Sequence, residues 1–285
     1  MSALGLALVL TAACCHATWN FFVKRIGGGS ELIWLFSAVA AVIYLPLAGW
    51  ILLTHPVQFD AVQIGFMLGS VLLHLAYFML LQTGYRHGDL SLVYPTARAT
   101  GPLLSTSFAV LLLGEHVSPQ MGVGAGIIIF GVLMLTGGGR RPATRIRTSV
   151  LFGLAAGVLI GSYTAWDAYS VATLMVPPLL LDYASSLGRI VLLTPVARRR
   201  WPLVRQHWRD HRTGVLAIAI FSPLAYILVL YAMTFTPVAY VAPTRETSVL
   251  LSVLAGSILL HEGQLRWRLG WALVILAGMT LLVAA

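Results

Sequence analysis

The sequence YPTARATG, residues 94–101, places an arginine inside a long apolar run. A related stretch, APTRETSV, occupies residues 242–249 and again places an arginine after a Pro-Thr pair. Charged side chains are rare inside a membrane, so the same local motif around Arg98 and Arg245 indicates two related halves.

Further matches between the two halves keep their order at an offset near 147 residues, with one residue of slippage between some blocks. A chance origin does not explain matches that include the rare charged positions. The matched residues are Trp19 and Asn20 with Trp166 and Asp167, residues 75–77 with 224–226, and Glu115 with Glu262.

The composition of the chain is typical of a membrane protein. Of its 285 residues 59% are hydrophobic and 9% are charged, and the mean hydropathy is +0.88. Apolar runs of about twenty residues, the length that crosses a bilayer, follow one another and must be helices because lipid cannot hydrogen-bond a bare backbone. The ten predicted spans are residues 3–23, 32–53, 61–83, 90–113, 120–136, 149–171, 178–197, 213–235, 238–260 and 269–285.

Each half holds five spans, an odd number, so the halves must cross the membrane in opposite senses. The predicted fold is therefore an all-α polytopic membrane protein of ten transmembrane helices, built as two inverted five-helix repeats. The predicted boundaries are 1–139 for the first repeat, 140–148 for a basic cytoplasmic linker and 149–285 for the second repeat.

Basic residues between the spans predict the orientation. The loops after even-numbered spans contain no Lys or Arg, and positive loops stay in the cytoplasm, so both termini are expected on the periplasmic or extracellular side of the inner (plasma) membrane. Basic residues follow the odd-numbered spans at Lys24, Arg25, Arg86, Arg140, Arg141, Arg145, Arg147, Arg198, Arg199, Arg200, Arg205, Arg209, Arg212, Arg266 and Arg268.

The net charge of +9 does not indicate nucleic acid, because the basic residues form short clusters between apolar runs rather than one exposed face. Trp201 and Trp208 lie within the basic stretch 198–212, which fits an interfacial segment that touches anionic lipid headgroups.

Several short motifs recur in the two halves and near the start of the chain. They are Tyr94, Pro95, Gly114, Glu115, Gly122 and Gly131 in the first half, their echo Pro243, Glu262, Gly270 and Gly278 in the second, and the stretch HATWN at 16–20. In these motifs the chain resembles the drug/metabolite transporter superfamily in its ten-helix EamA-type branch. The resemblance implies an alternating-access carrier with a central cavity between the halves, often an exporter of amino acids or related metabolites. Lipid-linked sugar flippases and phosphate-sugar exchangers also belong to the superfamily.

Charges inside the spans are the first candidates for function. Each costs about 3 kcal/mol or more near the bilayer centre, so each should face protein or water. Structural ion pairing and a direct substrate role both stay open for any one of them. The basic members are Arg98, Arg189 and Arg245, and the acidic members are Asp167, Asp182 and Glu246.

Arg98 and Arg245 favour a substrate role, because inverted symmetry brings matched positions to the same central axis from opposite sides. Glu246 follows Arg245 directly and points away from it on a helix, so it is not expected to neutralise Arg245 by itself. We expect the two arginines to hold an anionic or zwitterionic group.

Polar residues four apart define one face on each of spans one and six. His16 and Asn20 share a face of span one, and their counterparts Tyr163 and Asp167 share a face of span six. For His16 the alternative to substrate binding is a hydrogen-bonded histidine of the core. Asp167 is the candidate for proton coupling, with a fixed hydrogen bond or salt bridge between helices as the alternative.

Aromatic and polar residues elsewhere add to this predicted lining. Tyr94 precedes Arg98 by one helical turn, and packing is the alternative for the residues of spans three and eight. Span seven carries Asp182, Ser186 and Arg189 on one face, which indicates a polar stripe or a salt bridge. The additional lining residues are His74, Tyr77, Tyr94 and Tyr226.

Glycines spaced by four indicate close helix packing. They are Gly65 and Gly69, Gly122 and Gly126, and the series Gly153, Gly157 and Gly161.

These patterns predict a secondary transporter of small polar metabolites, such as amino acids or related anionic or zwitterionic compounds. Protons are the possible coupling ion, and membrane lipid surrounds the protein. The alternative is a flippase of a lipid or lipid-linked headgroup. The sequence has no Gly-x-Ser-x-Gly or His-Glu-x-x-His motif, so no enzyme activity, cofactor or metal site is predicted.

Overall fold

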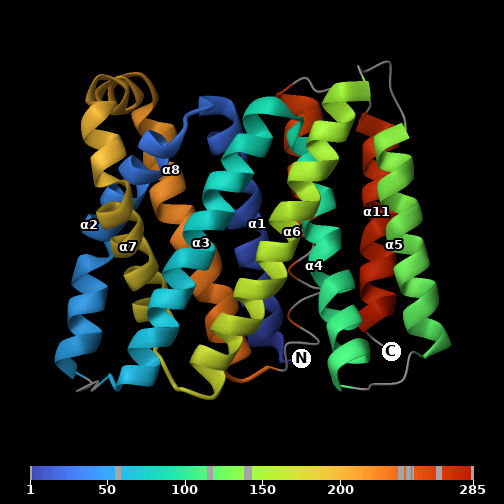
Figure 1. Cartoon of the computed structure of the whole chain (residues 1–285), viewed down its shortest axis with the longest axis horizontal. Helices are drawn as coiled ribbons and strands as arrows, with labels where there is room; N and C mark the ends of the chain where they lie inside the picture. Colours follow the sequence, from blue (N-terminus) through green and yellow to red (C-terminus); the bar gives the residue numbers. More distant parts are fainter. Residues whose placement is uncertain are drawn as a thin grey trace.

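The computed structural model describes residues 2–54, 59–113, 118–137, 143–236, 241, 245, 247–260 and 265–283. Within these ranges every regular element is a helix, and the helices stand side by side (Figure 1). The first half contains α1 (Ala3–Ile26), α2 (Ser30–Thr54), α3 (Ala61–His87), α4 (Leu90–Leu113) and α5 (Pro119–Gly137). The second half contains α6 (Ala143–Ala172), α7 (Pro178–Arg199), α8 (Trp201–Met233), α10 (Ser248–Leu254), the π-helix η1 (Ala255–Leu259) and α11 (Leu265–Val283).

Apolar length predicted these elements closely. The predicted spans 3–23, 61–83, 90–113 and 178–197 begin at the residues where α1, α3, α4 and α7 begin. Six helices of the described part of the chain, α1, α2, α3, α6, α7 and α8, are long and apolar enough to cross a membrane. The all-helical, two-repeat fold class is therefore confirmed.

Local signals fix several helix ends. Ser2 caps α1 by accepting a hydrogen bond from the Gly5 amide at 3.1 Å. Gly27 ends α1 with a φ of +68°, a left-handed conformation that glycine adopts without steric cost. At the start of α3, the side chain of Asp60 accepts from the Gln63 amide and the Gln63 side chain accepts from the Asp60 amide.

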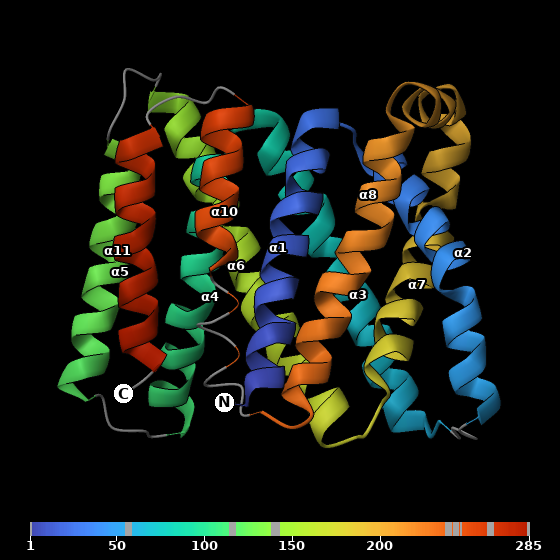
Figure 2. The same cartoon turned by 180° about the vertical axis from the view of Figure 1, so that it is seen from behind.

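The helices pack mainly across the two halves. The principal contacts of α1 are with α8, those of α3 with α6, those of α2 with α7, and those of α5 with α11. This pattern is unchanged when each helix is replaced by its counterpart in the other half, as repeats related by a two-fold axis require. Figures 1 and 2 show α5 and α11 paired at one end of the molecule and α2 with α7 at the other.

Close contact between α4 and α6 depends on the predicted glycine series. A Cβ atom added at Gly153 would lie 2.7 Å from Cβ of Thr96, and one added at Gly157 would lie 2.3 Å from Cβ of Thr100. Gly69 likewise packs against the ring of Trp166. These small residues therefore allow α6 to approach both α3 and α4.

Three other glycines do not have the packing role predicted for them. A Cβ atom added at Gly65, Gly122 or Gly126 would meet no described residue within 4 Å. In the α5–α11 pair the close approach instead uses Gly131 and Gly278, which contact Ile275 and Ile128 of the facing helix. Spacing alone did not indicate which face of α5 turns toward its partner.

The eighth predicted span, 213–235, also differs from the structure. Helix α8 begins at Trp201 and bends at His211, whose φ of −134° and ψ of 26° are not helical. Figures 1 and 2 show the first part of α8 as a coil seen nearly end-on, lying across the bundle at the face opposite both chain ends. The basic stretch therefore includes a short helix that lies flat on this face.

Candidate functional site

The ten residues predicted to bind substrate all lie in the protein interior, and none is more than 8% exposed. Helices of both halves supply them. They are His16 and Asn20 on α1, His74 and Tyr77 on α3, Tyr94 and Arg98 on α4, Tyr163 and Asp167 on α6, Tyr226 on α8, and Arg245.

The two predicted arginines lie near a common set of side chains. Arg98 and Arg245 are 2% and 4% exposed, and both are within electrostatic range of Tyr77, Tyr163 and His16. Arg98 on α4 and Arg245 therefore bring two positive charges near the same side chains, as matched positions in inverted repeats should.

Ser248 on α10 connects this region across the halves. Its Oγ lies 2.9 Å from the Tyr94 hydroxyl and accepts a hydrogen bond from Nη2 of Arg98 at 3.4 Å. The guanidinium of Arg98 also lies 5.7 Å from the centre of the Tyr94 ring. The sequence analysis missed Ser248, although its place one helical turn after Arg245 was the signal that could have found it.

Four rings form a compact aromatic cluster beside the arginines. The ring of Tyr163 lies 4.3 Å from that of His74, 5.2 Å from that of Tyr77 and 5.9 Å from that of Tyr226, measured between centroids. The ring of His74 also meets that of Tyr226 edge-on at 4.9 Å. Helices α3, α6 and α8 thus present flat polarisable faces and hydroxyl groups to one place.

Asp167 binds residues of two other helices. Its Oδ2 lies 2.8 Å from Nε2 of His74 and accepts a hydrogen bond from the Tyr226 hydroxyl at 2.5 Å. Asp167 has no exposed surface, and His74 is 5% exposed. The structure therefore joins α3, α6 and α8 through one buried carboxylate.

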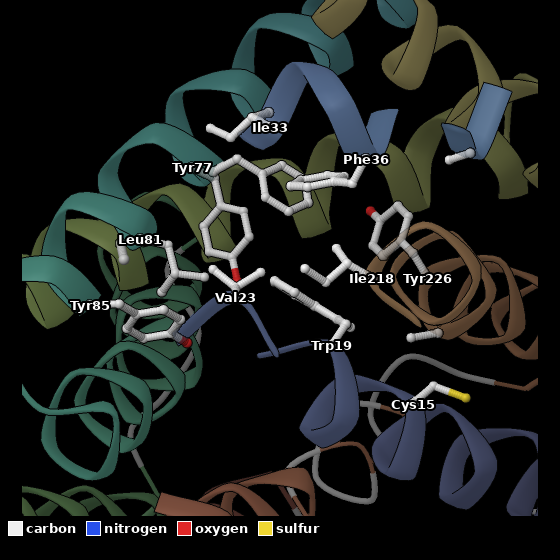
Figure 3. Close-up of a cluster of buried hydrophobic side chains, with 14 of the residues drawn as sticks. Cys15, Trp19, Val23, Ile33, Phe36, Tyr77, Leu81, Tyr85, Ile218 and Tyr226 are labelled. Carbon is white, nitrogen blue, oxygen red and sulfur yellow. The ribbon is translucent and has the colours of Figure 1, made fainter. Parts of the chain in front are cut away.

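The polar face of α1 is held by hydrogen bonds within the protein. Nε1 of Trp19 donates to Nδ1 of His16 at 3.1 Å, and the Asn20 amide donates to the His16 carbonyl at 2.7 Å. The Tyr85 hydroxyl donates to Oδ1 of Asn20 at 2.6 Å. Asn20 is therefore held between α1 and α3 by hydrogen bonds, and Figure 3 shows Trp19, Tyr77 and Tyr85 in the same core.

Comparison with known proteins decides the family. The model of the EamA-like transporter family matches residues 3–137 and again residues 147–284, so one five-helix unit is recognised twice along the chain. The protein belongs to the EamA-like transporter family. It is therefore a transporter of the drug/metabolite type and a multi-pass membrane protein.

Solved structures support the fold of this EamA-like transporter. One crystal structure aligns with 98% of this chain and 98% of its own length, at a TM-score of 0.56 and 13% sequence identity. At that identity the likeness concerns the fold alone. No curated protein matches the chain.

Span seven of the EamA-like transporter contains the predicted polar stripe. Arg189 donates hydrogen bonds to the hydroxyls of Ser37, Ser185 and Ser186 at 2.8–3.1 Å. Its guanidinium also lies 4.7 Å from the centre of the Phe78 ring. Among the described residues no ion pair joins Asp182 to Arg189. Glu246, another acidic residue predicted inside the spans, lies outside the described residues.

The face that carries the basic stretches contains contacts that the sequence analysis missed. Arg268, predicted in a loop, is only 2% exposed and lies 3.7 Å from Asp89, because α11 begins before it. Nζ of Lys24 donates to the carbonyls of Tyr85 and Gly88 at 2.7 Å, where α3 ends. Helices α1, α3, α4 and α11 are therefore tied together at this face.

Proposed function

We propose that this EamA-like transporter is a secondary carrier of small anionic or zwitterionic metabolites, amino acids among them, and that it works by alternating access. One observation carries the proposal. Arg98 and Arg245 occupy matched positions in the two halves, and both are buried within electrostatic range of Tyr77 and Tyr163. A guanidinium presents a planar fork of donors that suits carboxylate and phosphate groups.

The surroundings of the arginines support a small, partly aromatic or aliphatic solute. The rings of Tyr77, Tyr163 and Tyr226 offer contact area for an apolar portion, and their hydroxyls offer hydrogen bonds. The two arginines would hold its acidic group. The family resemblance implies export, so the direction of transport stays a prediction.

Alternating access is supported by the way in which the halves meet. Each principal helix pair joins one helix of the first half to one of the second, so the polar cluster lies at the contact between repeats. In inverted-repeat carriers, rocking of one repeat against the other exposes a fixed central site to each side in turn.

Purified protein in liposomes tests the function. The vesicles are loaded with an unlabelled amino acid, and entry of the same labelled amino acid is followed as counterflow. We expect counterflow for at least one amino acid or related acid, and its loss in Arg98→Gln and Arg245→Gln. Movement of a labelled lipid headgroup without movement of any water-soluble acid would instead identify a flippase.

A further inference from the structure

A buried histidine–carboxylate pair joins the two halves next to the proposed substrate site. His74 belongs to α3 of the first half and Asp167 to α6 of the second, and Nε2 of one lies 2.8 Å from Oδ2 of the other. We propose that this pair is the site at which the transporter binds a proton, and that its protonation is linked to solute binding at Arg98 and Arg245. The second part rests on the proposed function.

The hydrogen bonds of Asp167 are unequal in a way that suits proton binding. Oδ2 has two partners, His74 and the hydroxyl of Tyr226, whereas the buried Oδ1 has none among the described residues. A carboxylate oxygen buried without a donor is costly, and a proton added to the carboxyl group lowers that cost. The His74–Asp167 pair can therefore gain or lose a proton while the neighbouring helices keep the same packing.

The two-fold symmetry is broken at both members of the pair. Asn20 occupies the position of α1 that corresponds to Asp167, and it binds Tyr85 instead. With residues 75–77 matched to 224–226, the position of His74 is occupied in α8 by Pro223. Neither Asn nor Pro titrates, so only one of the two related helix contacts can bind a proton.

Other charged and titratable groups surround the pair on each side. Asp182 on α7 acts electrostatically on both His74 and Asp167, and Arg189 lies on the same helix. Tyr163 on α6 is within electrostatic range of Asp167 and of both arginines, and its ring lies 4.3 Å from that of His74. The full set is Tyr77 on α3, Tyr163 on α6, Asp182 and Arg189 on α7, Tyr226 on α8, His16 on α1, Arg98 on α4, and Arg245.

Charge determines the sign of the linkage. A proton raises the charge of the His74–Asp167 pair by one, next to a site that receives an anionic group. The two ligands therefore favour each other, and thermodynamic reciprocity requires each to raise the affinity of the other by the same factor. Coupling between sites is typically about 5- to 150-fold, and we expect the effect of pH on solute affinity to fall in that range.

Infrared difference spectroscopy of purified protein during a pH titration tests the proton site without any solute. The chain has nine Asp and Glu side chains, so several protonated-carboxyl bands should titrate. We expect one of them to be present in the parent and in Asp182→Asn and to be missing in Asp167→Asn. In His74→Gln, which can still donate to Oδ2 but does not titrate, this band should remain with a shifted midpoint. A parent spectrum with the same bands as Asp167→Asn, or an unshifted midpoint in His74→Gln, overturns the proposal.

Solute binding at several pH values tests the linkage. The probe is the amino acid that most raises the melting temperature of the purified protein. We expect its affinity to rise as the pH falls through the infrared midpoint, and to be independent of pH in Asp167→Asn. Retained pH dependence in that variant overturns the linkage. If no amino acid stabilises the protein, the proposed amino acid function fails while the infrared result still decides the proton site.

Discussion

Gly157 on α6 and Thr100 on α4 lie so close that a Cβ atom on the glycine would come within 2.3 Å of Cβ of the threonine. The backbone carbonyl of Ala97 would lie 2.7 Å from the same atom. A methyl group has no space there unless the two helices separate. This contact joins the two halves beside the helix that carries Arg98, so it contributes to both packing and function.

Replacing Gly157 by alanine should therefore destabilise the protein. We expect overpacking to cost about 1–3 kcal/mol, seen as a lower melting temperature of the purified protein. Gly126→Ala is the matched control, because no described residue lies within 4 Å of its added methyl group and alanine is the better helix former. Equal melting temperatures for the two variants would contradict the close packing of α4 on α6.

Replacing either central arginine should affect transport more than folding. We expect Arg98→Gln and Arg245→Gln each to weaken solute binding about 10- to 100-fold, the effect of losing a charge-assisted hydrogen bond of about 1.5–3 kcal/mol. Binding is measured by solute-dependent melting, and transport by counterflow. Arg205→Gln, on the exposed side of α8, is the control and should transport like the parent. Normal counterflow in both central variants would rule out the proposed site.

The buried carboxylate of Glu31 should hold the flat first part of α8, residues 201–211, in place. Glu31 at the start of α2 accepts hydrogen bonds from the Gly29 amide at 2.8 Å and from Nη1 of Arg200 at 3.0 Å, and its Oε1 lies 3.7 Å from Nε2 of His207. Its side chain is 5% exposed. We expect Glu31→Gln to lower the free energy of unfolding by about 1–3 kcal/mol and to speed proteolysis at residues 201–211.

A second variant separates this buried contact from surface charge in general. Arg209 and Asp210 also form an ion pair, at 2.9 Å, but in solvent on the exposed side of α8. Water and salt screen such a pair, so Asp210→Asn should leave both melting and proteolysis as in the parent. If the two variants behave alike, Glu31 does not hold α8 in place.

Orientation in the membrane gives a fourth prediction. In Figure 1 the two chain ends lie at one face, and the flat part of α8 lies at the other. Basic segments stay in the cytoplasm, so a reporter fused after Ala285 should be periplasmic, and one inserted in residues 140–148 should be cytoplasmic. The opposite pair of results would reverse the proposed topology.

The elements of the fold follow from the sequence because apolar length and lipid leave the backbone few choices. Side-chain partners do not follow in the same way. Asp167 was identified as a candidate for titration, but its partner His74 lies on α3 of the other half, and nothing local to either residue predicts their contact. Arg268 was placed in a loop because the start of a helix is hard to predict where polar residues begin an apolar run.

The cross-half pairing of helices has a consequence for biogenesis. While the ribosome synthesises α1 to α5, the principal partners of these helices, α6, α7, α8 and α11, are not yet in the bilayer. During this time, the faces of α1 to α5 that contact the second half have no partner helix. These faces include the ones that carry His74 and Arg98. Insertion can proceed helix by helix, but the contact of α5 with its principal partner cannot form until α11 has left the ribosome.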